Sequence, residues 1–183
     1  MKLLVAGGGA MGTALAGVLS QRHEVTLWCR RPGQAEELAG SRVNREHLPG
    51  YTLPASVRVV SGPVEASPFG LLLLAVPTQH LRHIVQVNGW QTFTGPVVNT
   101  AKGLELKTLR SPCRILEDLG VRMSALFALS GPSHAEEFAH DQPTSLVLAG
   151  EDEKLAEQLQ KELSVGPLRI YTSPDRLGVE LGG

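Results

Sequence analysis

The sequence predicts a doubly wound α/β fold, in which a mostly parallel sheet carries helices on both faces. Short apolar runs alternate with stretches of helical spacing along nearly the whole chain, which is typical of repeated strand-helix units. The most apolar run, residues 71–76, shows no polar alternation, as expected for a strand covered by helices on both sides. With 183 residues and 42% hydrophobic content, the chain can form one large domain.

The first fifty residues are predicted to form a β-α-β unit. Residues 2–6 are a short apolar strand closed by glycines, residues 10–21 have helical spacing, and residues 24–29 form a second strand. The two strands must therefore run parallel. The pattern continues with helices at 33–40, 78–87, 108–119, 133–140 and 151–163, and strands at 57–60, 71–76, 97–100, 126–129, 145–149 and 168–171.

The segment 44–54 interrupts this alternation. It contains Leu-Pro-Gly-Tyr-Thr-Leu-Pro, which is dense in turn-forming residues and fits neither the helical nor the strand period. We expect a surface loop here.

Composition narrows the class of protein. The net charge of -1 and the 19% charged content give no signature of nucleic-acid binding. No apolar run approaches the length of a membrane span. Two cysteines in a chain of this length do not make a disulfide framework, so we expect buried thiols and a cytoplasmic protein.

The strongest motif lies between the first strand and the first helix. Residues 7–12, Gly-Gly-Gly-Ala-Met-Gly, match G-x-G-x-x-G. In dinucleotide-binding folds Gly7 would permit the tight turn, Gly9 would let a pyrophosphate approach the backbone, and Gly12 would let the helix pack closely on the strand. Free N–H groups at the helix start would bind the phosphates. An incidental glycine-rich turn is the alternative, but the predicted strand before the motif and the predicted helix after it favour a Rossmann-like dinucleotide site.

The end of the second strand bears on the choice of cofactor. NAD-binding folds carry an acidic residue near this point, which binds the ribose 2′-hydroxyl. Here the chain reads Cys29-Arg30-Arg31. Two guanidinium groups suit a 2′-phosphate, so NADP is predicted, with NAD as a second cofactor. A solvated arginine pair is the other interpretation.

Two further residues are expected at the ligand-binding edge of the sheet. Pro77 follows strand 71–76 and would wall the cofactor, while Thr78 would cap the next helix. Lys102 follows strand 97–100, where its ammonium could bind a phosphate or a carbonyl oxygen or could simply be solvated.

Residues 130–137, Ser-Gly-Pro-Ser-His-Ala-Glu-Glu, are expected to open a helix with Ser133 as its cap. Adjacent Ser133 and His134 lack a third group for nucleophilic catalysis. The helically spaced pairs His80/His83 and Glu136/His140 lack a complete ligand set, so no metal site is predicted.

Together these strings resemble the bacterial NAD(P)-dependent glycerol-3-phosphate dehydrogenases. The resemblance covers essentially the whole chain and is most selective in Lys-Gly-Leu-Glu at 102–105, Ser-Gly-Pro-Ser at 130–133 and Val-Glu-Leu-Gly-Gly at 179–183. It also rests on residues 7–12, 44–54, 75–77 and 168–175. The chain departs from the family at His134, where an aromatic is usual, and at Ala10-Met11, where serine and an aromatic are frequent.

The resemblance implies an oxidoreductase of glycerophospholipid synthesis that reversibly reduces dihydroxyacetone phosphate to sn-glycerol 3-phosphate. It implies that Ala10, Met11, Arg30 and Arg31 contact the cofactor, and that Ala135 lies near it. Lys102 would contact cofactor and substrate, and Gly131 and Ser133 the substrate. The family's proton-transferring lysine would fall just beyond Gly183, so no catalytic residue is assigned.

The same resemblance implies a division of the chain. Residues 1–176 would be the NAD(P)-binding Rossmann-like domain, and residues 177–183 the start of a helical substrate domain that is otherwise absent. A homodimer is compatible with this assignment. The alternatives are an enzyme resembling ketopantoate reductase, which also uses NADP, or a dinucleotide-binding module without catalysis. The chain by itself is expected to be inactive.

Overall fold

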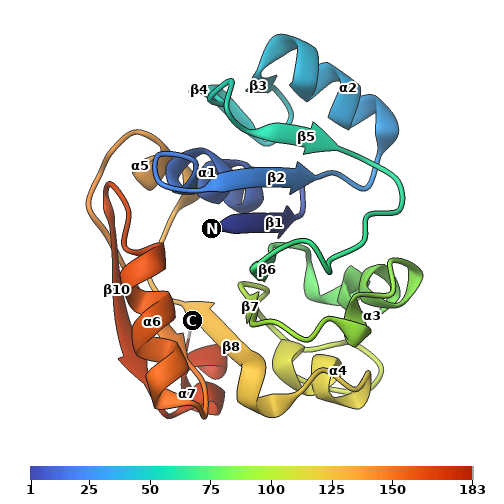
Figure 1. Cartoon of the computed structure of the whole chain (residues 1–183), viewed down its shortest axis with the longest axis vertical. Helices are drawn as coiled ribbons and strands as arrows, with labels where there is room; N and C mark the ends of the chain where they lie inside the picture. The colour runs from blue at the N-terminus through green and yellow to red at the C-terminus, as the bar shows by residue number, and fades with distance from the viewer. Residues whose placement is uncertain (183) are drawn as a thin grey trace.

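The computed structural model describes residues 1–182 and contains a sheet of eight strands, in the order β10-β9-β8-β7-β6-β1-β2-β5 (Figure 1). The strands are β1 (Lys2–Ala6), β2 (Glu24–Trp28), β5 (Arg58–Val60), β6 (Leu71–Leu74), β7 (Val97–Asn99), β8 (Leu126–Ser130), β9 (Thr144–Ala149) and β10 (Leu168–Ser173).

Six neighbouring strands of the sheet, β8, β7, β6, β1, β2 and β5, run parallel to one another. β1 pairs with β2 on one side and with β6 on the other, so that Leu3 lies opposite both Val25 and Leu71. β9 is antiparallel to β8, and β10 is parallel to β9. The mostly parallel α/β sheet predicted from the sequence is confirmed, with its last two strands reversed.

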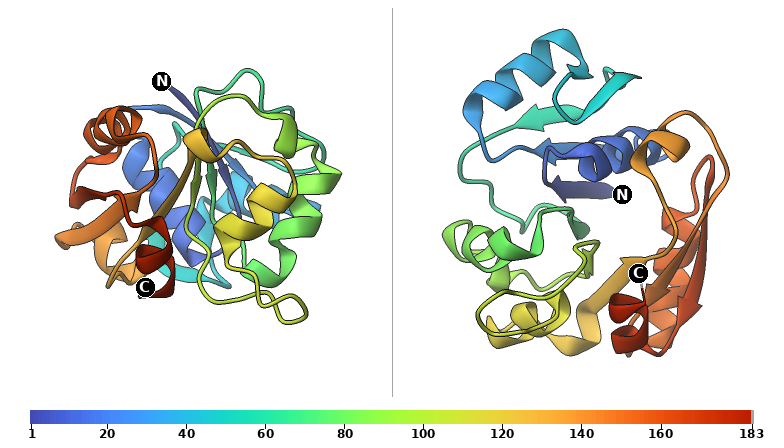
Figure 2. Two further views of the ribbon diagram at one scale, coloured as in Figure 1. Left: turned by 90° about the horizontal axis from the view of Figure 1, so that it is seen from below. Right: turned by 180° about the vertical axis from the view of Figure 1, so that it is seen from behind.

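Helices cover both faces of this sheet. They are α1 (Ala10–Leu19), α2 (Pro32–Ser41), α3 (Thr78–Val87), α4 (Pro112–Asp118), α5 (Ala135–Ala139), α6 (Glu153–Leu163) and α7 (Arg176–Leu181), with short 3-10 turns at Trp90–Thr92 and Met123–Ala125. Figure 2 shows α3 and α4, in green and yellow, on the opposite side from α1 and α6. No helix among the described residues has both the length and the apolar character needed to cross a membrane.

Alternation along β1 divides the core in two. Leu3 and Val5 belong to one buried cluster, which includes side chains of α1, α5 and α6. Leu4 and Ala6 belong to the other cluster, with side chains of α3 and α4. Since successive side chains of a strand point to opposite faces, one apolar run serves both layers.

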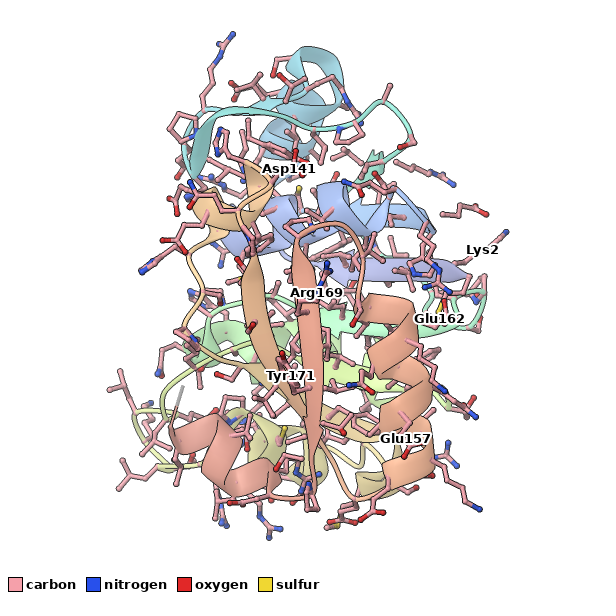
Figure 3. All side chains as sticks on the ribbon, turned by 90° about the vertical axis from the view of Figure 1, so that its left-hand side faces the viewer. Lys2, Asp141, Glu157, Glu162, Arg169 and Tyr171 are labelled. Carbon is pink, nitrogen blue, oxygen red and sulfur yellow. The ribbon has the colours of Figure 1, made fainter. Side chains whose placement is uncertain are left out.

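One edge of the sheet is formed by β10 and the other by β5. Arg169 and Tyr171 lie on β10, and Glu157 and Glu162 lie on the neighbouring α6 (Figure 3). Tyr171 is 58% exposed, whereas Leu168 and Ile170 are buried. The strand thus alternates between core and solvent, as one-sided edge strands do.

The segment 44–54 is not the surface loop expected from its composition. β3 (Val43–Asn44) and β4 (Leu48–Thr52) form a small antiparallel hairpin. Leu48 and Leu53 are almost fully buried and belong to the core cluster that contains α1. Their spacing of five residues matches no regular period, so only the tertiary contact reveals their role.

Two helix starts and the cap of a third helix, α3, differ from expectation. α4 begins at Pro112 rather than at 108, with Ser111 as its cap. α5 begins after His134 without side-chain capping, so the cap assigned to Ser133 is wrong. Pro77, not Thr78, precedes α3, and the Thr78 hydroxyl instead donates to the carbonyl oxygen of Lys102 at 2.5 Å.

Side chains of α3 hold the long loop between β7 and α4. The Arg82 guanidinium donates to both carboxylate oxygens of Glu105, each at 2.9 Å, and Thr108 donates to the same carboxylate. Chiefly because of the bond from Arg82, the pKa of Glu105 falls from 4.5 to about 2. The ionised carboxylate therefore fixes the loop that contains Lys102 to α3.

The last helix is attached through a buried carboxylate. Glu180 of α7 is 7% exposed and accepts hydrogen bonds from the Ser111 hydroxyl at 2.9 Å and the Cys113 N–H at 2.7 Å. Arg176, at the start of α7, pairs with Glu117 of α4. The predicted domain boundary at residue 176 stays a prediction, and Gly183 lies outside the described residues.

Replacement of Leu48 tests whether the hairpin is part of the core. Leu48→Ala should lower the free energy of unfolding by about 2–5 kcal/mol, because it leaves a cavity at a fully buried site. Leu106→Ala, at a leucine that is 79% exposed, should change it by less than about 0.5 kcal/mol. Urea unfolding measures both, and equal effects would contradict the packed hairpin.

The Arg82–Glu105 pair predicts a pH dependence. Because the pKa of Glu105 is lowered on folding, its stabilising effect is complete above about pH 4.5 and is lost as the pH falls toward 2. Glu105→Gln should therefore be less stable than the parent at pH 7, and the difference should shrink below pH 4.5. The control is Glu157→Gln, on the surface of α6; an identical pH trend in both variants would exclude the ion pair as the cause.

Candidate cofactor-binding cleft

A cleft of about 590 Å³ opens at the carboxyl ends of β1, β2, β6 and β7. The chain proceeds from β1 to β2 on one side, whereas β6 lies on the other, so the strand order reverses here. Ligands of open α/β sheets bind at such switch points, and pockets for small ligands span roughly 300–1,000 Å³. Position and size both suit a cofactor.

Most of the residues predicted to contact a cofactor line this cleft. They are Gly7, Gly9, Ala10, Met11, Arg30, Arg31, Pro77 and Lys102. Gly12 lies beneath the turn, and Ala135 is buried in the core cluster against which Ala10 and Met11 pack. The cleft is also lined by polar residues that no sequence motif indicated, namely Gln34, Glu46, His47, His80 and Thr100.

The three motif glycines have different surroundings. Gly7 has a φ of +131°, and a Cβ there would lie 2.2 Å from the carbonyl oxygen of Ala75. A Cβ on Gly12 would lie 1.9 Å from the carbonyl oxygen of Gly7. A Cβ on Gly9, by contrast, would meet no atom within 4 Å. Gly7 and Gly12 are therefore required by the fold, while Gly9 leaves open space toward the cleft.

The start of α1 faces this open space. Gly9 occupies the N-cap position with a φ of -80°, and within the described chain no side chain caps the helix. The first turn contains no acidic residue. The first N–H groups of a helix have no intrahelical acceptor, and the helix dipole adds positive potential at this end. The arrangement fits a phosphate group.

Two side chains hold the glycine turn from outside. The carbonyl oxygen of Gly8 accepts hydrogen bonds from the Gln34 amide of α2 at 2.6 Å and from the Asn44 amide of β3 at 2.9 Å. Asn44 is 4% exposed and also donates to the Thr13 hydroxyl at 2.7 Å. Neither Gln34 nor Asn44 stands out in the sequence, because both act across large separations along the chain.

The two arginines beyond β2 are not equivalent. Arg30 is exposed and makes no ion pair among residues 1–182. Arg31 donates to the carboxylate of Glu46, which lies in the turn of the β3–β4 hairpin. This bond is the main reason that the pKa of Glu46 is lowered, so the group is ionised at neutral pH. An acidic group thus lies beside the two arginines at this end of the cleft.

Lys102 lies in the loop three residues after β7, on the opposite side of the glycine turn from β2 in the strand order. Its ammonium donates to the carbonyl oxygen of Gly131, after β8, at 3.1 Å. Two of the three residues predicted to contact substrate are therefore together. Ser133 is half-buried and lies outside the cleft lining, and His134 is exposed.

The histidine pairs considered for metal binding remain isolated. In the described part of the chain, no three His, Cys, Asp or Glu side chains gather as a metal site would require. The His140 ring is instead hydrogen-bonded to the carbonyl oxygen of Glu136.

Known proteins resemble this chain over its whole length. The sequence model described as "NAD-dependent glycerol-3-phosphate dehydrogenase N-terminus" matches residues 2–156. Glycerol-3-phosphate dehydrogenase (NAD(P)+) of Nitrosomonas eutropha is 41% identical, and that of Thermus thermophilus 43% identical, each over 100% of this chain and 56% of the relative. The chain thus spans about half the length of the curated relatives it matches.

Solved structures also resemble this chain over nearly its whole length. The glycerol-3-phosphate dehydrogenase of Coxiella burnetii superposes with a TM-score of 0.87 and 26% identity, over 98% of this chain and 55% of that protein. A probable 2-dehydropantoate 2-reductase of Bacillus subtilis has a TM-score of 0.66 and 17% identity, over 98% of this chain and 60% of that protein, and shares the fold alone. The chain therefore belongs to the NAD-dependent glycerol-3-phosphate dehydrogenase family and corresponds to the N-terminal part of its members.

Proposed function

We propose that this chain binds NADPH, and NADH as a second cofactor, and forms the cofactor-binding part of a glycerol-3-phosphate dehydrogenase. The observation that carries the proposal is the uncapped start of α1, which faces the open space above Gly9 in a cleft of about 590 Å³. Such a helix start attracts phosphate, and the pyrophosphate of a dinucleotide supplies it.

The residues of the cleft have separate tasks in this proposal. The first N–H groups of α1, beside Ala10 and Met11, would hold the pyrophosphate, and Arg30 and Arg31 would hold the adenosine end of the cofactor. Pro77 would limit the cleft on the side of β6. The nicotinamide ring, when bound, supplies or accepts the hydride. Ala135 would support this site from the core, because Ala10 and Met11 pack against the cluster that contains it.

We assign substrate binding to the region around Lys102. The substrate pair is dihydroxyacetone phosphate and sn-glycerol 3-phosphate, both of which are anions. The ammonium of Lys102 would attract the substrate oxygen atoms, and Gly131 and Ser133 would contact the same molecule. Proton transfer to the carbonyl oxygen is not assigned to Lys102 or to another residue of this chain.

The 2-ketopantoate reductase alternative has weaker support. Its relative has the same fold, but the family match and the relatives near 40% identity are glycerol-3-phosphate dehydrogenases. A cytoplasmic location is part of our proposal and is supported by the two free, buried thiols of Cys29 and Cys113. We also propose that the protein forms a homodimer, which a measurement of its molar mass in solution would test.

Gly9→Val tests the phosphate site. A Cβ at this position would meet no atom of the chain within 4 Å, and the valine would occupy the space of the pyrophosphate. We expect NADPH to bind about 10- to 100-fold more weakly. Gly40→Val, on α2 and equally free of neighbours, is the control and should bind NADPH like the parent. Calorimetry measures both, and undiminished binding by a folded Gly9→Val would refute the proposed position.

Lys102→Met tests the lysine. Lys102 lines the same cleft as the glycine turn and would contact the cofactor as well as the substrate. Methionine has an unbranched side chain without the charge, so we expect NADPH to bind about tenfold more weakly. Lys107→Met removes a charge from the same loop outside the cleft lining and should have little effect. Fluorescence titration compares the two variants; equal affinities would assign Lys102 to the solvated surface.

A further inference from the structure

The acidic side chain beside Arg31 has no assigned role in the cleft. We propose that Glu46 determines the preference between the two cofactors: its carboxylate accepts a hydrogen bond from the ribose 2′-hydroxyl of NADH, and it weakens recognition of the NADPH 2′-phosphate by occupying Arg31 and by repulsion. The inference rests on the proposed function and deepens it.

The hairpin places Glu46 at this end of the cleft. Residues 45–47 form its turn, and the buried amide of Asn44 ties the strand before the turn to the carbonyl oxygen of Gly8. The same Asn44 side chain accepts a hydrogen bond from the His47 N–H at 3.3 Å. Both sides of the turn are thus bound to a residue that contacts the glycine motif, which fixes the position of Glu46 relative to the cleft.

The contacts of Glu46 leave it available to a ligand. Its side chain is 57% exposed and lines the cleft, and that of Arg31 is 50% exposed. One carboxylate oxygen receives the bond from Arg31, and the other lies 3.5 Å from the His47 ring nitrogen. A carboxylate has about four acceptor positions, so these contacts do not exhaust it.

The two cofactors differ chemically at this point. A ribose with two free hydroxyls can donate to a carboxylate, and NAD-binding folds use an acidic residue at the end of the second strand for this purpose. Here the hairpin provides the carboxylate, whereas the strand end provides Arg30 and Arg31. A 2′-phosphate gains from the arginines but is repelled by Glu46 and must compete with it for Arg31. One site can therefore accept both cofactors, with Glu46 favouring NADH.

The test measures dissociation constants of NADPH and NADH by calorimetry in the parent chain, Glu46→Ala and Glu46→Gln. Both variants should bind NADPH about fivefold more tightly, since both remove the negative charge. Glu46→Ala should bind NADH about fivefold more weakly, and Glu46→Gln should recover part of this loss because its amide carbonyl can still accept. Glu157→Ala and Glu157→Gln are the controls, because Glu157 is an exposed carboxylate on α6, outside the cleft lining and far along the chain from Arg31.

A second comparison separates direct contact from an effect through Arg31. In an Arg31→Ala background, Glu46→Ala should still weaken NADH binding, because the ribose contact does not involve the arginine. Disappearance of the NADH effect in that background would overturn the direct contact. An unchanged ratio of NADPH to NADH affinity in Glu46→Ala would overturn the whole inference while the parent still binds both cofactors. If the parent binds neither, the proposed function itself fails.

Discussion

The carbonyl oxygen of Gly8 joins three parts of the molecule that are distant in sequence. This oxygen accepts hydrogen bonds from the side-chain amides of Gln34, on α2, and Asn44, in the hairpin. Gly8 itself belongs to the turn that precedes α1. α2 follows directly after Arg31, and the hairpin carries Glu46. The segments that carry Arg31 and Glu46 are therefore both fixed by hydrogen bonds to the carbonyl oxygen of Gly8. Such bonds are costly to leave unmade in a buried site, which restricts how the parts can move.

The electrostatic character of the cleft is local. The whole chain has a net charge of -1, yet Arg30 and Arg31 lie at one end of the cleft, Lys102 at the other, and the start of α1 between them. An anionic ligand is thus attracted by the placement of a few groups and not by the protein's overall charge. Glu46 is the exception within this positive region, and its carboxylate accepts a hydrogen bond from Arg31.

Local patterns predicted the sheet and the glycine turn well, because buried strands such as residues 71–74 are apolar throughout and the motif at 7–12 stands between a strand and a helix. They failed where tertiary contact decides the structure. Leu48 and Leu53 are buried by packing in the cluster of α1, and the reversal of β9 depends on how the chain returns to the sheet. Arg31 and Glu46 are 15 residues apart, and they meet because of the hairpin. The turn-forming residues of this segment had instead predicted a loop.

The hydrogen bond from Lys102 to Gly131 has a consequence for ligand binding. A free lysine side chain samples many rotamers and loses up to about 2 kcal/mol of conformational entropy when it is immobilised. In this protein the ammonium, on an exposed side chain beyond the end of β7, already donates to the carbonyl oxygen of Gly131 at 3.1 Å. An ammonium has three donor hydrogens, so an arriving anion can add a bond without displacing the first. Part of the ordering that recognition of an anion would require is thus already present, and such preorganisation lowers the entropic cost of each new contact.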